Sequence, residues 1–219
     1  MDNLNKYIEH TLLKQDATHS ELIKLFQEAV SNKFFGVCIN PVNVKFAKEF
    51  LQDTDVKIVT VIGFPLGANK SEVKAFEAKL AVNDGADEID MVINVSMLKD
   101  KDFQAAQADV EAVKTACGDK ILKVILETDL LTKEEIENAC KICVNANADF
   151  VKTSTGFVKN GIGAKVEDIA LMNKIVSPHG MRVKASAGIR DKQKAIEMIN
   201  AGAARLGTSS GVEIVKVTT

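Results

Sequence analysis

The sequence lacks an excess of charge of either sign, and it lacks any long apolar run. Its 219 residues include 28 lysines and arginines against 30 aspartates and glutamates, so nothing in the charge balance indicates nucleic-acid binding. The longest apolar runs are far shorter than the about 20 residues of a membrane-spanning helix. Residues 1–6 have neither the basic nor the apolar region of a signal peptide. We therefore expect a soluble cytoplasmic protein without nucleic-acid or membrane partners.

Cysteine, histidine and proline are also scarce. Four cysteines at irregular spacing, Cys38, Cys117, Cys140 and Cys143, are typical of reduced thiols and not of a disulfide framework. Two of them form a C-x-x-C string inside a helical pattern without a second pair, and the three histidines are scattered, so we expect no metal site. No proline- or serine-rich linker divides the chain, which predicts one domain over residues 1–219.

Apolar, β-branched runs alternate with amphipathic segments along the whole chain. Such continuous apolar strands between helices indicate a parallel sheet covered by helices. Capping boxes at 18–21 and 132–135 predict helix starts, and a short leading helix is expected at residues 3–7. Eight units of about 27 residues favour a closed (β/α)8, or TIM, barrel over an open doubly wound sheet, which usually has fewer strands. The strands are expected at residues 8–13, 36–40, 56–64, 88–95, 121–127, 150–154, 182–185 and 205–207.

One six-residue pattern occurs twice towards the end of the chain. V-K-x-S-x-G covers residues 151–156 and again residues 183–188. The segment between them has the content of one loop and one helix, so the two strings should lie on neighbouring parallel strands, about 5 Å apart. Lys152 and Lys184 would then face each other at the carboxyl ends of the strands, where barrel enzymes carry their chemistry.

Two adjacent lysines at that place are suited to nucleophilic chemistry. The ordinary lysine pKa of about 10.4 must fall to about 7 before the amine is substantially neutral, which requires about 4 kcal/mol. One cation at about 4–5 Å, in an effective dielectric constant of about 20, supplies about 3–4 kcal/mol, and burial acts in the same direction. A neutral lysine of this kind can form a Schiff base with a carbonyl compound. The alternative is two lysines that extend from the strand ends into solvent.

Asp90 and two glycine-bearing turns accompany the lysine pair. Asp90 stands in an otherwise apolar strand, where a carboxylate needs a partner, and we expect it to reach the lysines. There it would relay protons through water or form a structural salt bridge. The turns at 187–188 and 207–211 follow the last two strands, where barrels often bind phosphate on backbone N–H groups and on a short final helix.

Taken together, these strings resemble those of deoxyribose-phosphate aldolases, which are class I aldolases on a TIM barrel. The resemblance implies reversible cleavage of 2-deoxy-D-ribose 5-phosphate into D-glyceraldehyde 3-phosphate and acetaldehyde through a lysine Schiff base, without a metal or organic cofactor. It extends over essentially the whole chain, in the strings at residues 8–13, 37–41, 88–94, 123–128, 152–157, 184–186 and 207–210.

The resemblance also implies roles for individual residues. Lys152 would form the Schiff base, Lys184 would lower the pKa of Lys152, and Asp90 would be the proton-relay carboxylate. The phosphosugar substrate would be bound by a further set of residues near the strand ends, namely Glu9, Cys38, Gly156, Gly188, Gly207, Ser209 and Ser210.

Three departures from the family pattern affect the expected substrate site. The family usually has aspartate at Glu9 and glycine at Ala187, where alanine keeps the N–H group but disfavours a positive φ. The loop 158–165 is also unusual, and its Lys159 or Lys165 could add phosphate contacts. None of these changes touches the lysine pair or Asp90.

Two other functions and the assembly state stay open. One alternative is a Schiff-base aldolase that acts on another phosphosugar. The other is a catalytically silent phosphosugar-binding barrel, in which we would expect a lysine or Asp90 to have been lost. A homo-oligomer, dimer or tetramer, is compatible with the sequence, but no surface patch decides the matter.

Overall fold

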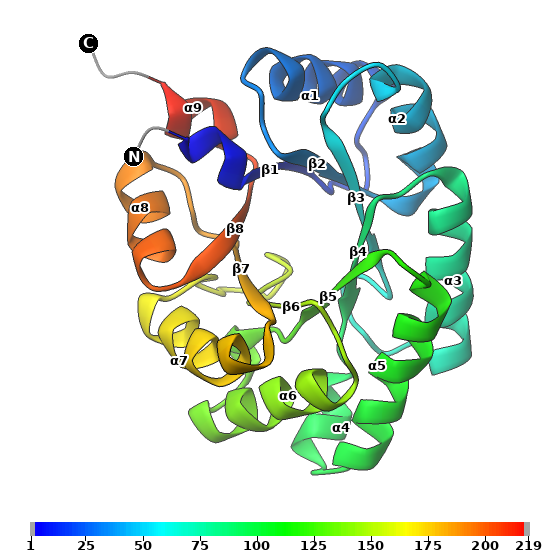
Figure 1. Cartoon of the computed structure of the whole chain (residues 1–219), viewed down its shortest axis with the longest axis vertical. Helices are drawn as coiled ribbons and strands as arrows, with labels where there is room; N and C mark the ends of the chain where they lie inside the picture. The colour runs from blue at the N-terminus through cyan, green and yellow to red at the C-terminus, as the bar shows by residue number, and fades with distance from the viewer. Residues whose placement is uncertain (1–2, 217–219) are drawn as a thin grey trace.

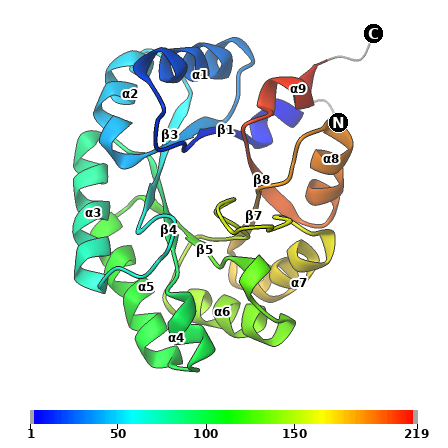
Figure 2. The ribbon, with the colours of Figure 1, turned by 180° about the vertical axis from the view of Figure 1, so that it is seen from behind.

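The protein, described by a computed structural model over residues 3–216, is a closed barrel of parallel strands. The strands follow one another in chain order around the ring, and the first pairs with the last. Helices surround the ring in both the front and rear views (Figures 1 and 2). The predicted (β/α)8 barrel is therefore confirmed. The strands are β1 (Ile8–Leu12), β2 (Gly36–Ile39), β3 (Lys57–Ile62), β4 (Glu88–Val92), β5 (Ile121–Ile125), β6 (Phe150–Lys152), β7 (Arg182–Ser186) and β8 (Ala203–Thr208).

The outer layer consists of α-helices with short 3-10 turns between them. Both predicted capping boxes are present, at Thr18 before α1 and at Thr132 before α6, so these two helices begin where local sequence specifies it. The elements are η1 (Leu4–Tyr7), α1 (His19–Ser31), η2 (Pro41–Asn43), α2 (Val44–Leu51), α3 (Ser71–Asp84), α4 (Val95–Lys99), α5 (Phe103–Cys117), η3 (Thr128–Leu130), α6 (Lys133–Asn145), α7 (Val166–Val176), η4 (Ser177–His179), α8 (Lys192–Asn200) and α9 (Gly211–Val215).

The fourth strand is shorter than the sequence predicts. β4 ends at Val92 and not at Val95. The side chain of Asn94 caps α4, where its Oδ1 accepts from the N–H groups of Ser96 and Met97 at 3.1 and 3.4 Å. Asparagine favours this capping position, and a five-residue helix is too short to leave a periodic signal, which is why α4 was missed.

The two faces of each strand have different surroundings. On β4, Ile89 and Met91 belong to the apolar core between strands and helices, whereas Glu88 and Asp90 alternate with them and point into the barrel. The barrel interior is therefore polar at this level, and its groups must pair with one another.

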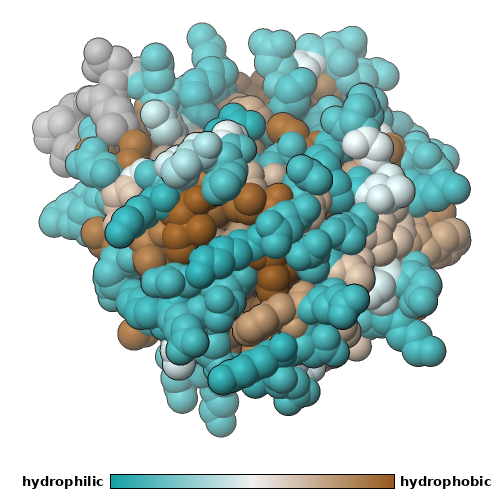
Figure 3. All heavy atoms as spheres, turned by 60° about the horizontal axis from the view of Figure 1, so that its bottom comes forward, coloured by the Kyte–Doolittle hydropathy of each residue, from teal (hydrophilic) through white to brown (hydrophobic). Residues whose placement is uncertain are grey.

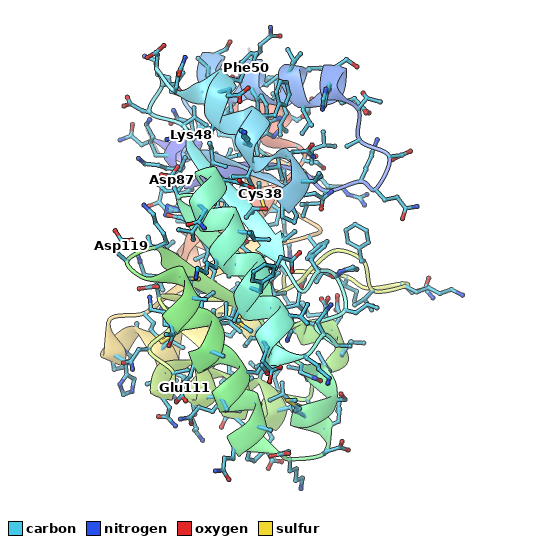
Figure 4. The ribbon with its side chains drawn as sticks, turned by 90° about the vertical axis from the view of Figure 1, so that its right-hand side faces the viewer. Cys38, Lys48, Phe50, Asp87, Glu111 and Asp119 are labelled. Carbon is cyan, nitrogen blue, oxygen red and sulfur yellow. The ribbon has the colours of Figure 1, made fainter. Side chains whose placement is uncertain are left out.

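A buried ion pair ties two helices to the end of β4. Lys74 on α3 donates to Asp109 on α5 at 2.7 Å and to the carbonyl oxygen of Val92 at 3.0 Å, and both charged side chains are buried. The two helices lie side by side on the outside of the barrel (Figure 4). Because Val92 lies two residues beyond Asp90, this contact anchors the strand that carries Asp90.

The face of the molecule shown in Figure 3 is mostly hydrophilic, and apolar side chains are visible between the hydrophilic ones near its middle. The outer face of α3 exposes Val73, Phe76 and Leu80, a stripe that the sequence analysis did not single out. No helix within residues 3–216 is long and apolar enough to cross a bilayer.

Replacement of Lys74 by methionine should strongly destabilise the fold. The change leaves the Asp109 carboxylate buried without its cation, and we expect the free energy of unfolding in urea to fall by about 3–5 kcal/mol. The double variant Lys74→Met/Asp109→Leu should recover most of that loss. Lys24→Met, which removes an exposed pair with Glu28 on α1, should change it by less than about 0.5 kcal/mol. A loss in Lys74→Met no larger than in Lys24→Met would contradict the assignment.

Candidate active site

The two lysines of the repeated pattern face each other as predicted. Lys152 at the end of β6 pairs in register with Lys184 on β7. One oxygen, Oδ2 of Asp90, accepts from both ammonium groups, at 2.8 Å from Lys152 and 2.7 Å from Lys184. All three side chains are buried, so the lysines do not extend into solvent. The expectation that Asp90 reaches the lysine pair is confirmed.

The pair belongs to a larger buried charge network. Lys123 donates to the other oxygen of Asp90 at 2.8 Å and lies 2.6 Å from a carboxylate oxygen of Glu88. Glu9 accepts from Lys184 and from Nε of Arg205, the latter at 3.3 Å. The network thus contains four basic side chains and three carboxylates, and it has three charges of each sign when one lysine is neutral. Its members are Glu9, Glu88, Asp90, Lys123, Lys152, Lys184 and Arg205.

Burial and charge act in opposite directions on these groups. Burial alone would raise the pKa of Asp90, but the three surrounding ammonium groups outweigh it and hold that pKa well below its usual range. Burial alone would lower the pKa of Lys184, but the carboxylates of Asp90 and Glu9 outweigh it and raise that pKa. Asp90 and Glu9 also raise the pKa of Lys123 against burial. While these contacts persist, Lys184 and Lys123 are therefore held as cations and Asp90 as an anion.

Lys152 is the member of this network that opens into a cavity. The cavity has a volume of about 320 Å³ and lies at the carboxyl ends of β1, β6, β7 and β8. Lys152 contributes to its wall, whereas Lys123 and Lys184 have no exposed surface. The amine of Lys152 is therefore placed where a molecule bound in the cavity can reach it.

Several of the predicted substrate residues line the same cavity. Gly156, Gly188, Gly207 and Ser209 do so. Among them Gly156, Gly188 and Ser209 are exposed, which places them towards the open end, away from the buried lysine. Two cations that the sequence analysis did not select, Lys14 and Arg190, also line the wall.

Three other predicted substrate residues are not part of the cavity wall. Glu9 and Cys38 are buried beside Asp90 and Lys184, deeper than the cavity. Ser210 precedes α9, and its N–H group donates to the hydroxyl of Thr208 at 3.0 Å. A direct substrate contact of these three residues stays a prediction.

Ala187 adopts the backbone conformation that alanine disfavours. Its φ is +66°, and the next residue, Gly188, has a φ of +73°. The carbonyl oxygen of Ala187 accepts from the N–H group of Ala164 at 3.1 Å, and a Cβ at Gly163 would come within 2.6 Å of that carbonyl. The loop 158–165 thus packs against the turn and holds it in place.

The loop uses one of its two lysines for its own structure. Lys165 lies 3.3 Å from Asp129, whose other oxygen accepts from the N–H group of Gly163 at 2.7 Å. Lys159 is exposed. A phosphate contact is therefore less favoured for Lys165 than for Arg190, which lines the cavity.

Glu9, Cys38 and Asp90 bring three potential metal-ligand atoms within 4.8 Å of one another. The carboxylate oxygens already accept from Lys123, Lys184 and other cations of the chain, and burial raises the pKa of the Cys38 thiol. The carboxylates of Glu9 and Asp90 are therefore already neutralised by ammonium groups of the protein, which does not favour a metal ion at this place.

The sequence analysis missed Lys123, Glu88 and Arg205. A signal existed for each of them, because each is a charged residue within an expected strand. Glu88 is also two residues from Asp90 and so on the same face. Lys123 stands alone in the apolar run at residues 121–126, as Asp90 does in its own strand.

Comparison with known proteins shows which family the chain belongs to. The family model for DeoC/LacD family aldolases matches residues 4–217. The deoxyribose-phosphate aldolase of Brevibacillus brevis is 57% identical over 213 residues, which are 97% of this chain and 95% of the relative. That of Lactococcus lactis subsp. lactis is 54% identical, over 97% of this chain and 96% of the relative. The tetrameric structure of deoxyribose phosphate aldolase from Aeropyrum pernix superposes with a TM-score of 0.87 at 33% identity, over 96% of this chain and 88% of that chain.

Replacement of Ala187 by glycine should stabilise the protein. Glycine removes the unfavourable contact of Cβ at positive φ, and we expect the free energy of unfolding in urea to rise by about 0.5–1 kcal/mol. Ala185→Gly, two residues earlier in β7 and without a positive φ, is the matched control and should instead lose about 0.5–1 kcal/mol or more. If Ala187→Gly lowered the free energy of unfolding as Ala185→Gly does, the positive φ at residue 187 would not be a source of strain.

Proposed function

Because the chain belongs to the DeoC/LacD family of aldolases, we propose that it reversibly cleaves 2-deoxy-D-ribose 5-phosphate into D-glyceraldehyde 3-phosphate and acetaldehyde. The observation that carries the proposal is the position of Lys152. It is the one lysine of the buried network that lines the cavity, and it shares the carboxylate of Asp90 with Lys184. A Schiff-base aldolase needs a nucleophilic amine, and a neighbouring cation and a carboxylate are suited to activate that amine and to transfer protons.

The reaction begins when neutral Lys152 attacks the aldehyde carbon, C1, of the open-chain sugar. Loss of water from the adduct gives an iminium ion. The C2–C3 bond then breaks as the C3 hydroxyl loses its proton, so C3 becomes the aldehyde of glyceraldehyde 3-phosphate. The bonding electron pair passes to C2, and the iminium becomes an enamine. Protonation at C2 and hydrolysis release acetaldehyde and the free amine.

The neighbours of Lys152 supply charge and move protons in this scheme. Lys184 is held as a cation by Asp90 and Glu9, so it opposes a second positive charge on Lys152. Asp90 contacts both ammonium groups through one oxygen, which makes it the carboxylate through which a proton can pass, by way of water, to and from the substrate.

The phosphate would lie at the open end of the cavity. Gly188 and Ser209 are exposed on the wall there, the glycine without a side chain and the serine with a hydroxyl. Arg190 provides the cationic partner that a phosphate favours. This places the aldehyde carbon at the buried end, beside Lys152, and the phosphate towards solvent.

Borohydride trapping tests the proposed nucleophile. Borohydride treatment of the protein in the presence of 2-deoxy-D-ribose 5-phosphate or acetaldehyde should leave one stable reduced adduct. Peptide mass spectrometry should locate that adduct on Lys152. Lys152→Met should be neither labelled nor active, whereas Lys24→Met on the exposed surface of α1 should behave as the unmodified protein. An active protein that shows no adduct, or an adduct on another lysine, would refute the mechanism.

Replacement of Lys184 by leucine tests the role of the neighbouring cation. Without that charge the repulsion between the two neighbouring ammonium groups is lost, and the rising limb of the kcat/KM profile should move to higher pH. At pH 7 the turnover should fall about 100-fold or more. Circular dichroism would establish that the variant is folded, and Lys24→Leu serves as the control. A folded variant with an unchanged pH profile would contradict the pairing.

A further inference from the structure

Two serine hydroxyls of the active-site cavity lack a hydrogen-bond partner within the described residues. The side chains of Ser154 and Ser186 are buried, and neither Oγ atom makes a hydrogen bond to the protein. Both residues line the cavity that contains Lys152. A buried hydroxyl without a partner lowers stability unless a ligand supplies the missing bond. These two hydroxyls are therefore available to a polar group of a bound ligand.

The other hydroxyls of the cavity wall are already paired or face solvent. Thr11 and Thr208 donate to backbone carbonyl oxygens at 2.9 and 2.7 Å, and Thr155 donates to a carboxylate. Ser209 is exposed at the open end. Ser154 and Ser186 thus differ from their neighbours in being both buried and unpaired.

The backbone fixes both serines one level above the two lysines. Ser186 lies two residues after Lys184 on β7, so it is on the same side of that strand and nearer its carboxyl end. Ser154 lies two residues after Lys152, just beyond the end of β6. The hydroxyl of Thr153 donates to the carbonyl oxygen of Ser186 at 3.1 Å and accepts from its N–H group at 3.0 Å. This clamp extends the pairing of β6 and β7 beyond the last strand residue and holds Ser186 in place.

Gly207 leaves the space that the Ser186 hydroxyl occupies. A Cβ at Gly207 would lie 2.4 Å from Oγ of Ser186 and 3.0 Å from Cε of Lys184. The glycine on β8 is therefore needed for the serine side chain, in addition to any contact of its own with a phosphate. This packing keeps Oγ of Ser186 at the cavity wall.

We propose that Ser154 and Ser186 bind the C4 hydroxyl of the phosphosugar, which is the C2 hydroxyl of glyceraldehyde 3-phosphate. The inference rests on the proposed function and names two residues that determine its substrate specificity. A serine hydroxyl both donates and accepts, as does a sugar hydroxyl, whereas a fully ionised phosphate only accepts. The serines stand between Lys152, where the aldehyde carbon is bound, and the glycines and Arg190 at the phosphate end.

The choice of C4 over C3 follows from the chemistry. The C3 hydroxyl loses its proton when the C2–C3 bond breaks, so it belongs with the proton-carrying groups around Asp90. The C4 hydroxyl keeps its proton throughout and needs a partner that holds it without ionising. Neutral hydroxyls one level nearer the open end provide such a partner.

The test compares two acceptor aldehydes in the synthetic direction with acetaldehyde. D-Glyceraldehyde 3-phosphate carries the hydroxyl in question, and 3-oxopropyl phosphate lacks it. For Ser154→Ala and Ser186→Ala, kcat/KM with glyceraldehyde 3-phosphate should fall about 5–10-fold, as expected for one neutral hydrogen bond. With 3-oxopropyl phosphate it should change less than about 2-fold. Ser31→Ala, at an exposed position on α1, is the matched control.

Two further measurements separate this inference from a structural role and from failure of the proposed function. Removal of an unpaired buried hydroxyl should leave Tm unchanged or raise it. Borohydride trapping of acetaldehyde on Lys152 should be unchanged in both serine variants, which shows that the Schiff base forms normally. The proposal would be overturned if kcat/KM fell equally with both acceptors, with or without a lowered Tm. It would also be overturned if kcat/KM fell with neither acceptor. Absence of trapping in the unmodified protein would instead contradict the proposed function.

Discussion

One carboxylate determines the arrangement of the active site. Asp90 accepts from Lys152 and Lys184 through one oxygen and from Lys123 through the other. These contacts join β4, β5, β6 and β7 across the interior of the barrel, and they hold three ammonium groups around one carboxylate. Removal of that anion would leave three like charges in a buried space, so the fold and the chemistry depend on the same side chain.

The site is organised in levels along the barrel axis. Charges that pair among themselves lie deepest, Lys152 forms the boundary with the cavity, and Ser154 and Ser186 follow one level above it. Glycines and Arg190 lie around the open end. The phosphosugar that we propose as substrate would enter aldehyde first and meet these groups in turn. The helix layer supports this order, because Lys74 holds the carboxyl end of β4 through the carbonyl oxygen of Val92.

The parts of the site that could be predicted from the sequence are those that local patterns determine. The repeated pattern placed Lys152 beside Lys184, because two parallel strands joined by one helix pair in a predictable way. Asp90 was found because a charge in an apolar strand needs a partner. The contacts across the barrel interior could not be predicted from the sequence. Strand alternation shows which face of the sheet a side chain occupies, but not which residue of a distant strand it contacts. Arg205 is such a case, because it meets Glu9 and Glu88 from β8.

The network is also sorted by sign along the chain. The first four strands contribute its carboxylates, Glu9, Glu88 and Asp90, while the last four contribute Lys123, Lys152, Lys184 and Arg205. Either half of the barrel, folded alone, would carry charges of one sign on its inner face with nothing to neutralise them on burial. Each half is thus an electrostatic complement of the other. The interior loses its water only when the two come together, which makes closure of the barrel a single cooperative event and disfavours a stable half-barrel intermediate.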